Sequence, residues 1–288
     1  MKIGVSSYSF SQLINSGRET QLSIIKIAKE MGFDGIEFTD LNTPDGMTEA
    51  EYAQQIREES EKLGLPVIIY TIGANFLDEK GLDAEVERVC RKVDIAKILG
   101  AKKLRHDAAW RIPEDKKKFT GFEQILPALI EGCKRVTEYA ETQGIETMIE
   151  NHGFLCQDSA RNEKIITGVG NENFGALVDI GNFSCADEEN NKAVGIMAPY
   201  AKHIHAKDFF IRKDNGFDPG RGFFRSRGGN YLRGTIIGQG DVPVLQCLRL
   251  IKESGYDGYV SVEFEGMEPC LDGIAAGKEN IEKMLKIF

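Results

Sequence analysis

The stretch KEMGFDGIEF (29–38) joins the end of a polar, periodic segment to a short apolar run through Gly32. Glycine readily adopts the left-handed conformation that closes a helix, so this stretch predicts a helix end followed by a strand. The same junction recurs at EKLGLPVIIY (61–70), KILGAKKLRH (97–106), ETQGIETMIE (141–150) and KESGYDGYVSVEF (252–264). A unit that repeats in this way indicates an α/β fold.

Three further apolar runs bring the number of predicted strands to eight. They are KIGVSSYSF (2–10), FGALVDIGN (174–182) and AKHIHAKD (201–208). The predicted strands lie at 3–8, 35–39, 66–72, 102–107, 145–151, 175–181, 202–207 and 258–264, and a last helix follows near 272–287. Strands that alternate with helices form a parallel sheet, because each parallel crossover needs a helix. We therefore predict a single-domain (β/α)8 TIM barrel over residues 1–288. An open doubly wound sheet is disfavoured because no GxGxxG follows the first strand.

Helix signals and one long connection refine this prediction. Thr48 and Glu51 have the spacing of a capping box at the start of the second helix. Residues 209–240 are rich in Gly, Arg and aromatics and follow the seventh strand, with no regular element expected in them. A connection of this length is usually a functional loop or a lid.

Composition restricts the kinds of partner. The formal net charge of −9 argues against nucleic acid or an anionic membrane, because both select basic surfaces. No segment has the length and apolar character of a signal peptide or a membrane span. The six cysteines form no CxxC pair, which is typical of free thiols in a reducing compartment. We expect a cytoplasmic protein that acts on a small molecule, with a homo-oligomer left open.

The carboxyl ends of the last four barrel strands carry the candidate chemistry. Barrel active sites lie at this end of the strands, which here present Glu150, Asp179, His205 and Glu263. Three converging carboxylates cannot all stay ionised without a cation, because like charges raise one another's pKa. We therefore predict one divalent metal ion held by these four residues. Three oxygens and one nitrogen favour Mn²⁺, Co²⁺ or Mg²⁺, with Zn²⁺ also compatible.

Four motifs on these strands resemble those of the xylose isomerase-like barrel superfamily, often described as sugar phosphate isomerases and epimerases. The motifs are IENHG (149–153), VDIGN (178–182), HIHAKD (203–208) and SVEFEG (261–266). The resemblance implies the same four metal ligands and gives Glu150 and Glu263 a second role as the acid/base pair. Asn182 and Cys156 depart from the ketose 3-epimerases, which have His and Glu at these positions. His152 and Lys207 are more similar to the dehydratase-like branch.

Residues around the predicted ligands are candidates for catalysis and substrate binding. His152 has the same facing as Glu150 and is a candidate general base or hydroxyl contact. Lys207 could neutralise developing negative charge, and Asn182 stands close to the metal Asp. His106 and Trp110 are candidates for one pocket wall, with core packing as the alternative. His203 and Glu37 are candidates for support of the metal ligands, again with packing as the alternative.

These features favour a metal-dependent isomerase or epimerase that removes a proton next to the carbonyl of a keto-sugar or polyol. A lyase or dehydratase, of the inosose dehydratase type or cleaving a 3-keto-glycoside, is the alternative on the same metal site. An endonuclease acting at abasic sites is disfavoured, because the chain has only 4 His and an acidic charge. A non-catalytic sugar-binding barrel is disfavoured by the intact set of four ligands.

Overall fold

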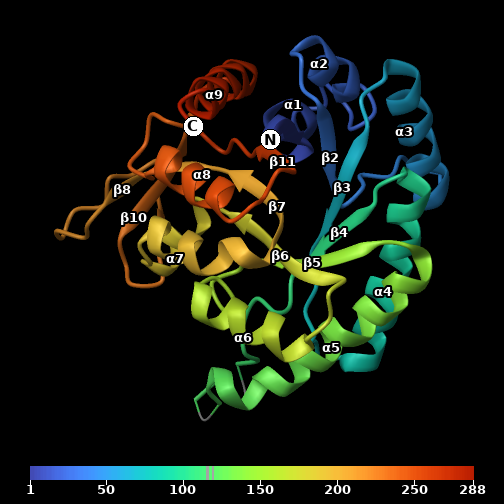
Figure 1. Ribbon diagram of the computed structural model, residues 1–288, viewed down its shortest axis with the longest axis vertical. Helices are drawn as coiled ribbons and strands as arrows, with labels where there is room; N and C mark the ends of the chain where they lie inside the picture. The colour runs from blue at the N-terminus through green and yellow to red at the C-terminus, as the bar shows by residue number, and fades with distance from the viewer. Residues whose placement is uncertain (115–116, 119) are drawn as a thin grey trace.

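The computed structural model describes residues 1–114, 117–118 and 120–288 and contains a closed barrel of parallel strands (Figure 1). Around the barrel the order is β1-β11-β7-β6-β5-β4-β3-β2. The strands are β1 (Lys2–Ser6), β2 (Gly35–Thr39), β3 (Val67–Ile72), β4 (Lys103–His106), β5 (Glu146–Glu150), β6 (Phe174–Asp179), β7 (Ala201–Ala206) and β11 (Tyr259–Val262). Each corresponds to one predicted strand, so the (β/α)8 prediction is confirmed.

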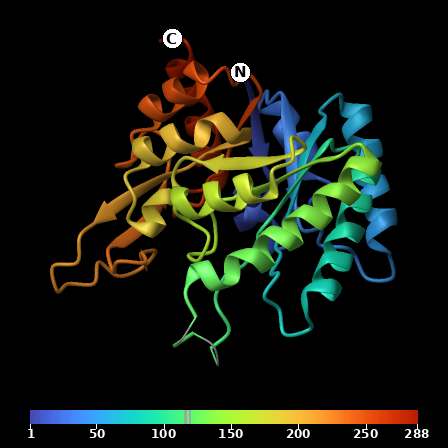
Figure 2. The same ribbon diagram turned by 60° about the horizontal axis from the view of Figure 1, so that its bottom comes forward.

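Helices cover the outside of the barrel, as Figures 1 and 2 show. They are α1 (Ser11–Asn15), α2 (Ile24–Glu30), α3 (Glu49–Leu63), α4 (Leu82–Leu99), α5 (Phe122–Gln143), α6 (Ser159–Val169), α7 (Asn190–Met197), α8 (Val244–Glu253) and α9 (Cys270–Leu285). Three 3-10 turns, η1 (Ser7–Phe10), η2 (Asn182–Ala186) and η3 (Ala198–Tyr200), follow or precede strands. All five predicted helix-closing glycines have positive φ, and the Thr48–Glu51 capping box is present.

The connection at 209–240 corrects the sequence prediction, because it contains regular structure. Strands β8 (Asp208–Arg212), β10 (Tyr231–Thr235) and β9 (Phe224–Arg225) form a small antiparallel sheet that extends outward from the barrel in Figures 1 and 2. The Asp208 carboxylate anchors the return of this segment by accepting hydrogen bonds from the backbone N–H groups of Gly238, Gly240 and Val242. A side chain at Gly240 would collide with this carboxylate, which accounts for the glycine.

An irregularity in β7 sets the height of the histidines inside the barrel. Ala176 pairs with Ala201, but the next residue, Leu177, pairs with His203, so Lys202 is an extra residue in the ladder. Such a bulge resets which residues face each other. After it, Asp179 pairs with His205, and the two side chains lie on adjacent strands at the same level of the barrel.

No helix among residues 1–114, 117–118 and 120–288 has both the length and the apolar character that a bilayer crossing requires. All six cysteines are free thiols, and five of them are buried.

Candidate metal centre and active site

Side chains from four consecutive barrel neighbours meet in the mouth of the barrel. Glu150 on β5, Asp179 at the end of β6, His205 on β7 and Glu263 after β11 each offer a ligand atom, and these atoms lie within 4.8 Å of one another. All four residues are buried. The structure thus brings together the same four residues that the sequence singled out, in a group compact enough to contact one cation.

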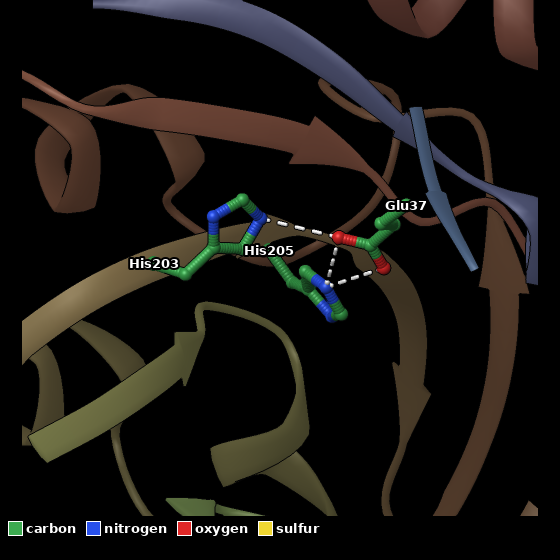
Figure 3. A group of neighbouring side chains, drawn as sticks. All are labelled: Glu37, His203 and His205. Carbon is green, nitrogen blue, oxygen red and sulfur yellow. Dashed lines mark hydrogen bonds and ion pairs between the residues drawn. The ribbon is translucent and has the colours of Figure 1, made fainter. Parts of the chain in front are cut away.

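The imidazole of His205 is oriented by the carboxylate of Glu37, which it contacts in Figure 3. Its Nε2 lies 2.8 Å from Oε1 of Glu37, which comes from β2. Its Nδ1 faces the cluster, 3.3 Å from Oε2 of Glu263 and 3.9 Å from Oδ2 of Asp179. A histidine that donates one N–H to a carboxylate presents the lone pair of its other nitrogen, as metal-ligating histidines usually do.

Two buried atoms of the cluster show that the residues fit a cation. Nδ1 of His205 and Oδ2 of Asp179 make no well-aligned hydrogen bond to any described residue. Buried polar atoms are normally paired, because an unpaired one forfeits its hydration without compensation. Both atoms point to the same spot, so a divalent cation there would satisfy them together.

His203 completes the support beneath the cluster. Its Nε2 lies 3.1 Å from Oε2 of Glu37 and 2.9 Å from Oγ of Ser261. Burial alone would raise the pKa of Glu37, but His205 and His203 outweigh it and hold the pKa well below its usual range. Glu37, His203 and His205 are also close enough to share an ion. Such an ion would have to take the His205 nitrogen that Glu37 already engages, so we assign Glu37 and His203 to support.

Two cations offset the negative charge of the cluster. Nζ of Lys207 lies 2.7 Å from Oε2 of Glu263 and 3.2 Å from Oδ2 of Asp179, and Nε of Arg105 lies 2.7 Å from Oε2 of Glu150. Burial raises the pKa of Asp179 to about 7 even though Lys207 lowers it. Burial would also raise the pKa of Glu263, but Lys207 and His205 hold it well below its usual range.

Asn182 links two members of the cluster. Its amide donates to Oε1 of Glu150 at 2.9 Å, and its carbonyl oxygen accepts from Nζ of Lys207 at 3.2 Å. The side chain is buried, and its two groups are engaged by these neighbours. Asn182 therefore fixes the positions of the Glu150 and Lys207 side chains relative to each other. Its contact with substrate stays a prediction.

His152 stands at the rim of the same pocket and is paired with Asp107. Its Nδ1 lies 3.0 Å from Oδ1 of Asp107, and 47% of its side chain remains exposed. Enclosure by the pocket lowers the pKa of His152, but Asp107 outweighs this and raises it above the ordinary value. Trp110 donates from Nε1 to the other oxygen of Asp107 at 2.9 Å and is half exposed.

The structure corrects the placement of His106. Side chains alternate along a strand, and Arg105 on β4 points into the barrel toward Glu150, so His106 points outward to the helices. There it is fully buried next to the rings of Phe76 and Phe174, and burial lowers its pKa to about 4. His106 is therefore part of the packed core, which was the alternative to a place in the pocket wall. Arg105 occupies the inward position on β4.

These side chains line a cavity of about 200 Å³ at the carboxyl end of the barrel. Its lining residues are Tyr8, Thr39, Thr71, Arg105, Glu150, His152, His205, Lys207, Glu263 and Glu265. Tyr8, Arg105 and Glu265 lie at predicted strand ends, but the sequence did not predict that they line the cavity. Trp110 does not line this cavity.

Comparison with known proteins agrees with this architecture. The sequence model of the xylose isomerase-like TIM barrel family matches residues 25–287. The chain belongs to this family. An inosose dehydratase of Lacticaseibacillus casei is 26% identical over 159 residues, which are 53% of this chain and 50% of that protein. The chain thus matches about half the length of the curated relatives it resembles.

Solved structures of other proteins have the same fold. The IOLI protein with a bound zinc atom superposes with a TM-score of 0.77 and 17% identity, covering 100% of this chain and 99% of that one. L-ribulose 3-epimerase superposes with a TM-score of 0.72 and 16% identity, covering 99% of this chain and 95% of that one. At these identities the likeness concerns the fold alone.

Glu37 generates the first testable prediction for this xylose isomerase-like barrel. Glu37→Gln keeps the size of the side chain and removes the charge that holds His205, so Mn²⁺ affinity is expected to fall by about 10- to 100-fold. Calorimetric titration of chelator-treated protein with Mn²⁺ measures this. Gln21→Glu, a change at a buried polar residue on the entry to α2, is a control for general disturbance. Unchanged Mn²⁺ affinity in Glu37→Gln would show that His205 is positioned without the carboxylate.

Metal affinity should also depend on pH. Burial lowers the pKa of His205, but Glu37 and Glu263 outweigh it and raise the pKa well above the ordinary value, while that of Asp179 is about 7. Near neutral pH the metal-free site therefore carries protons that an ion must displace, so binding releases protons and tightens as pH rises. Mn²⁺ titrations from pH 6 to pH 8 in buffers of different ionisation enthalpy measure both effects. An affinity independent of pH would contradict them.

Proposed function

We propose that the protein is a divalent-metal-dependent isomerase or epimerase that removes a proton next to the carbonyl of a keto-sugar or polyol. The observation that carries the proposal is the convergence of the four ligand atoms within 4.8 Å, where His205 Nδ1 and Asp179 Oδ2 have charged neighbours but no well-aligned hydrogen bond among the described residues. A cavity of about 200 Å³ above them suits a small ligand.

Glu150, Asp179, His205 and Glu263 would hold the ion, and their three oxygens and one nitrogen suit Mn²⁺, Co²⁺, Mg²⁺ or Zn²⁺. When bound, the ion supplies Lewis-acid polarisation of a substrate carbonyl, which acidifies the neighbouring C–H. The zinc atom of the structurally similar IOLI protein supports a metal in this fold.

The protein's own groups would carry the proton transfer. Glu150 and Glu263 reach the centre from strands separated by β6 and β7, so they approach a substrate between them from different sides. One carboxylate takes the proton beside the carbonyl, and the other returns a proton to the opposite face or to the adjacent carbon. Lys207, 2.7 Å from Glu263, is placed to stabilise negative charge that develops on a substrate oxygen.

Hydrogen exchange tests the proposal directly. Protein loaded with Mn²⁺ is incubated in deuterated water with a panel of ketoses and keto-polyols, and incorporation is followed by NMR. We expect deuterium at the carbon next to the carbonyl, with loss of exchange after chelation and recovery on adding metal back. In Glu263→Gln, exchange should fall by about 1,000-fold, since this side chain is both a ligand and an acid/base group. Absence of exchange across the whole panel would refute the proposal.

A dehydratase reaction is the second candidate, and the His152–Asp107 pair favours it. An imidazole whose pKa is raised by a buried carboxylate is a suitable general acid for a leaving hydroxyl. The partial match to inosose dehydratase supports the same reaction class. In this case, proton removal by the carboxylates is followed by loss of the β-hydroxyl as water, with His152 providing the proton.

His152→Gln separates the two candidates. For a dehydratase, this variant should still exchange the proton next to the carbonyl, while the rate of enone formation, followed by ultraviolet absorbance, falls by about 100-fold. For an epimerase, no absorbing product appears in either protein. His152→Asn provides a shorter polar control. If both exchange and product formation were unaffected in both variants, His152 would have no part in the chemistry.

A further inference from the structure

A second cleft, of about 580 Å³, lies beside the metal centre and has no part in the chemistry proposed above. It is formed by the segment after β3, the first turns of α4, and Trp110. Its lining residues are Asp40, Gly73, Ala74, Asn75, Asp78, Lys80, Ala84, Glu85, Arg88, Arg91 and Trp110. It is larger than the cavity at the metal centre, so a group bound there could exceed the size of the reacting group.

The cleft begins where the metal cavity ends. Thr39 and Thr71 line the metal cavity, whereas Asp40 and Gly73, one and two residues further along the same strand ends, line the cleft. Trp110 forms the border between them, because its Nε1 donates to Asp107, the partner of His152. A ligand seated at the metal centre could therefore extend along the ends of β2 and β3 into the cleft.

Both guanidinium groups and two of the carboxylates that line the cleft are already paired within the protein. Arg88 lies 2.8 Å from Glu85, Arg91 lies 2.7 Å from Glu87, and Asp40 lies 3.0 Å from Lys92. Three acidic and three basic residues line the cleft, so it has no excess of either charge. A phosphate or carboxylate would find no unpaired cluster of guanidinium groups, which such anions select. The cleft therefore suits an uncharged group with several hydrogen-bonding atoms.

Trp110 gives the cleft an aromatic wall. The indole lies between two glycines: a methyl group at Gly73 would be 3.1 Å from its Cζ2, and one at Gly153 would be 3.3 Å from its Cδ1. Its Nε1 is anchored by Asp107, yet 52% of the residue is exposed. An aromatic ring that is fixed in place and left half uncovered can serve as a contact surface for a ligand. The C–H face of a sugar ring is apolar enough to pack on it, while the ring hydroxyls reach the polar lining.

We propose that this cleft binds a second, uncharged sugar ring, and that the substrate is a glycoside of the keto-sugar rather than a free or phosphorylated monosaccharide. This inference rests on the proposed function, because the keto-sugar ring is taken to lie at the metal centre. It assigns substrate selection to Trp110 and the polar lining of the cleft. The metal ligands then recognise only the reacting ring.

Tryptophan fluorescence measures the proposed binding directly, since Trp110 is the only tryptophan of the chain. The probes are the ketose disaccharides lactulose, turanose and isomaltulose, with fructose as the single ring and fructose 6-phosphate as the charged one. We expect at least one disaccharide to shift Trp110 emission with a Kd about tenfold or more below that of fructose and of fructose 6-phosphate. The titrations are run with Mn²⁺ and after chelation.

Ala84→Phe fills the cleft from α4 and is the matched variant. It should weaken disaccharide binding by about tenfold relative to fructose binding, whereas Lys97→Phe, on the same helix and outside the cleft, should leave that ratio as in the wild type. Circular dichroism verifies that both variants fold. Lys80→Ala, which removes a polar lining group without filling space, is a second variant expected to weaken disaccharide binding.

The outcomes distinguish this inference from the proposed function. Disaccharide binding that survives chelation and is lost in Ala84→Phe supports the cleft even if no hydrogen exchange is found. Hydrogen exchange in fructose, together with equal binding of fructose and all three disaccharides, overturns the cleft and leaves the proposed function standing. Preference for fructose 6-phosphate overturns the assignment of an uncharged ring.

Discussion

Three carboxylates crowded into one buried pocket are the constraint on which the site depends. Glu150, Asp179 and Glu263 repel one another strongly in a poorly hydrated environment, and the protein compensates with Lys207, Arg105 and His205. Lys207 lies within ion-pair distance of both Asp179 and Glu263. A divalent cation would compete with the Lys207 ammonium for the same two carboxylates. Metal affinity and the position of this ammonium group would therefore be coupled.

The barrel makes this crowding achievable because its parallel strands all end at one rim. The extra residue Lys202 in β7 brings His205 level with Asp179, and Glu37 reaches across from β2 to fix the imidazole. Glu37 is itself held by His203, whose ring also contacts Ser261 on β11. The support of a single ligand therefore ties together β2, β7 and β11, which are separated in the sequence but face one interior.

The sequence predicted those parts of the molecule that follow from strand position. Glycine-closed helices located the strands, and residues at the strand ends then had to converge, so the meeting of Glu150, Asp179, His205 and Glu263 was predictable. His106 was misplaced because its neighbour Arg105 takes the inward position, and a shift of one residue reverses the facing of a strand side chain. The sheet within 209–240 was missed because its glycines and arginines obscure the alternation, and the Asp208 anchor depends on backbone groups some thirty residues away. The cleft is built from loops and one helix face, which carry no motif.

Asp107 connects the two halves of the rim and explains how recognition could act on chemistry. Its carboxylate accepts from Trp110 on the cleft side, lies 3.0 Å from Nδ1 of His152 on the other, and is paired with Arg105 at 2.8 Å. Arg105 in turn contacts Glu150 at 2.7 Å. A ring packed on Trp110 would thus be separated by the indole from the carboxylate that contacts His152, and by the indole, Asp107 and Arg105 from Glu150. Because Asp107 and Arg105 at the centre of this network are buried, a movement of the indole would reach His152 through protein groups rather than through water. Under the proposed function, binding of a ring on Trp110 and the orientation of His152 would therefore be linked through one carboxylate.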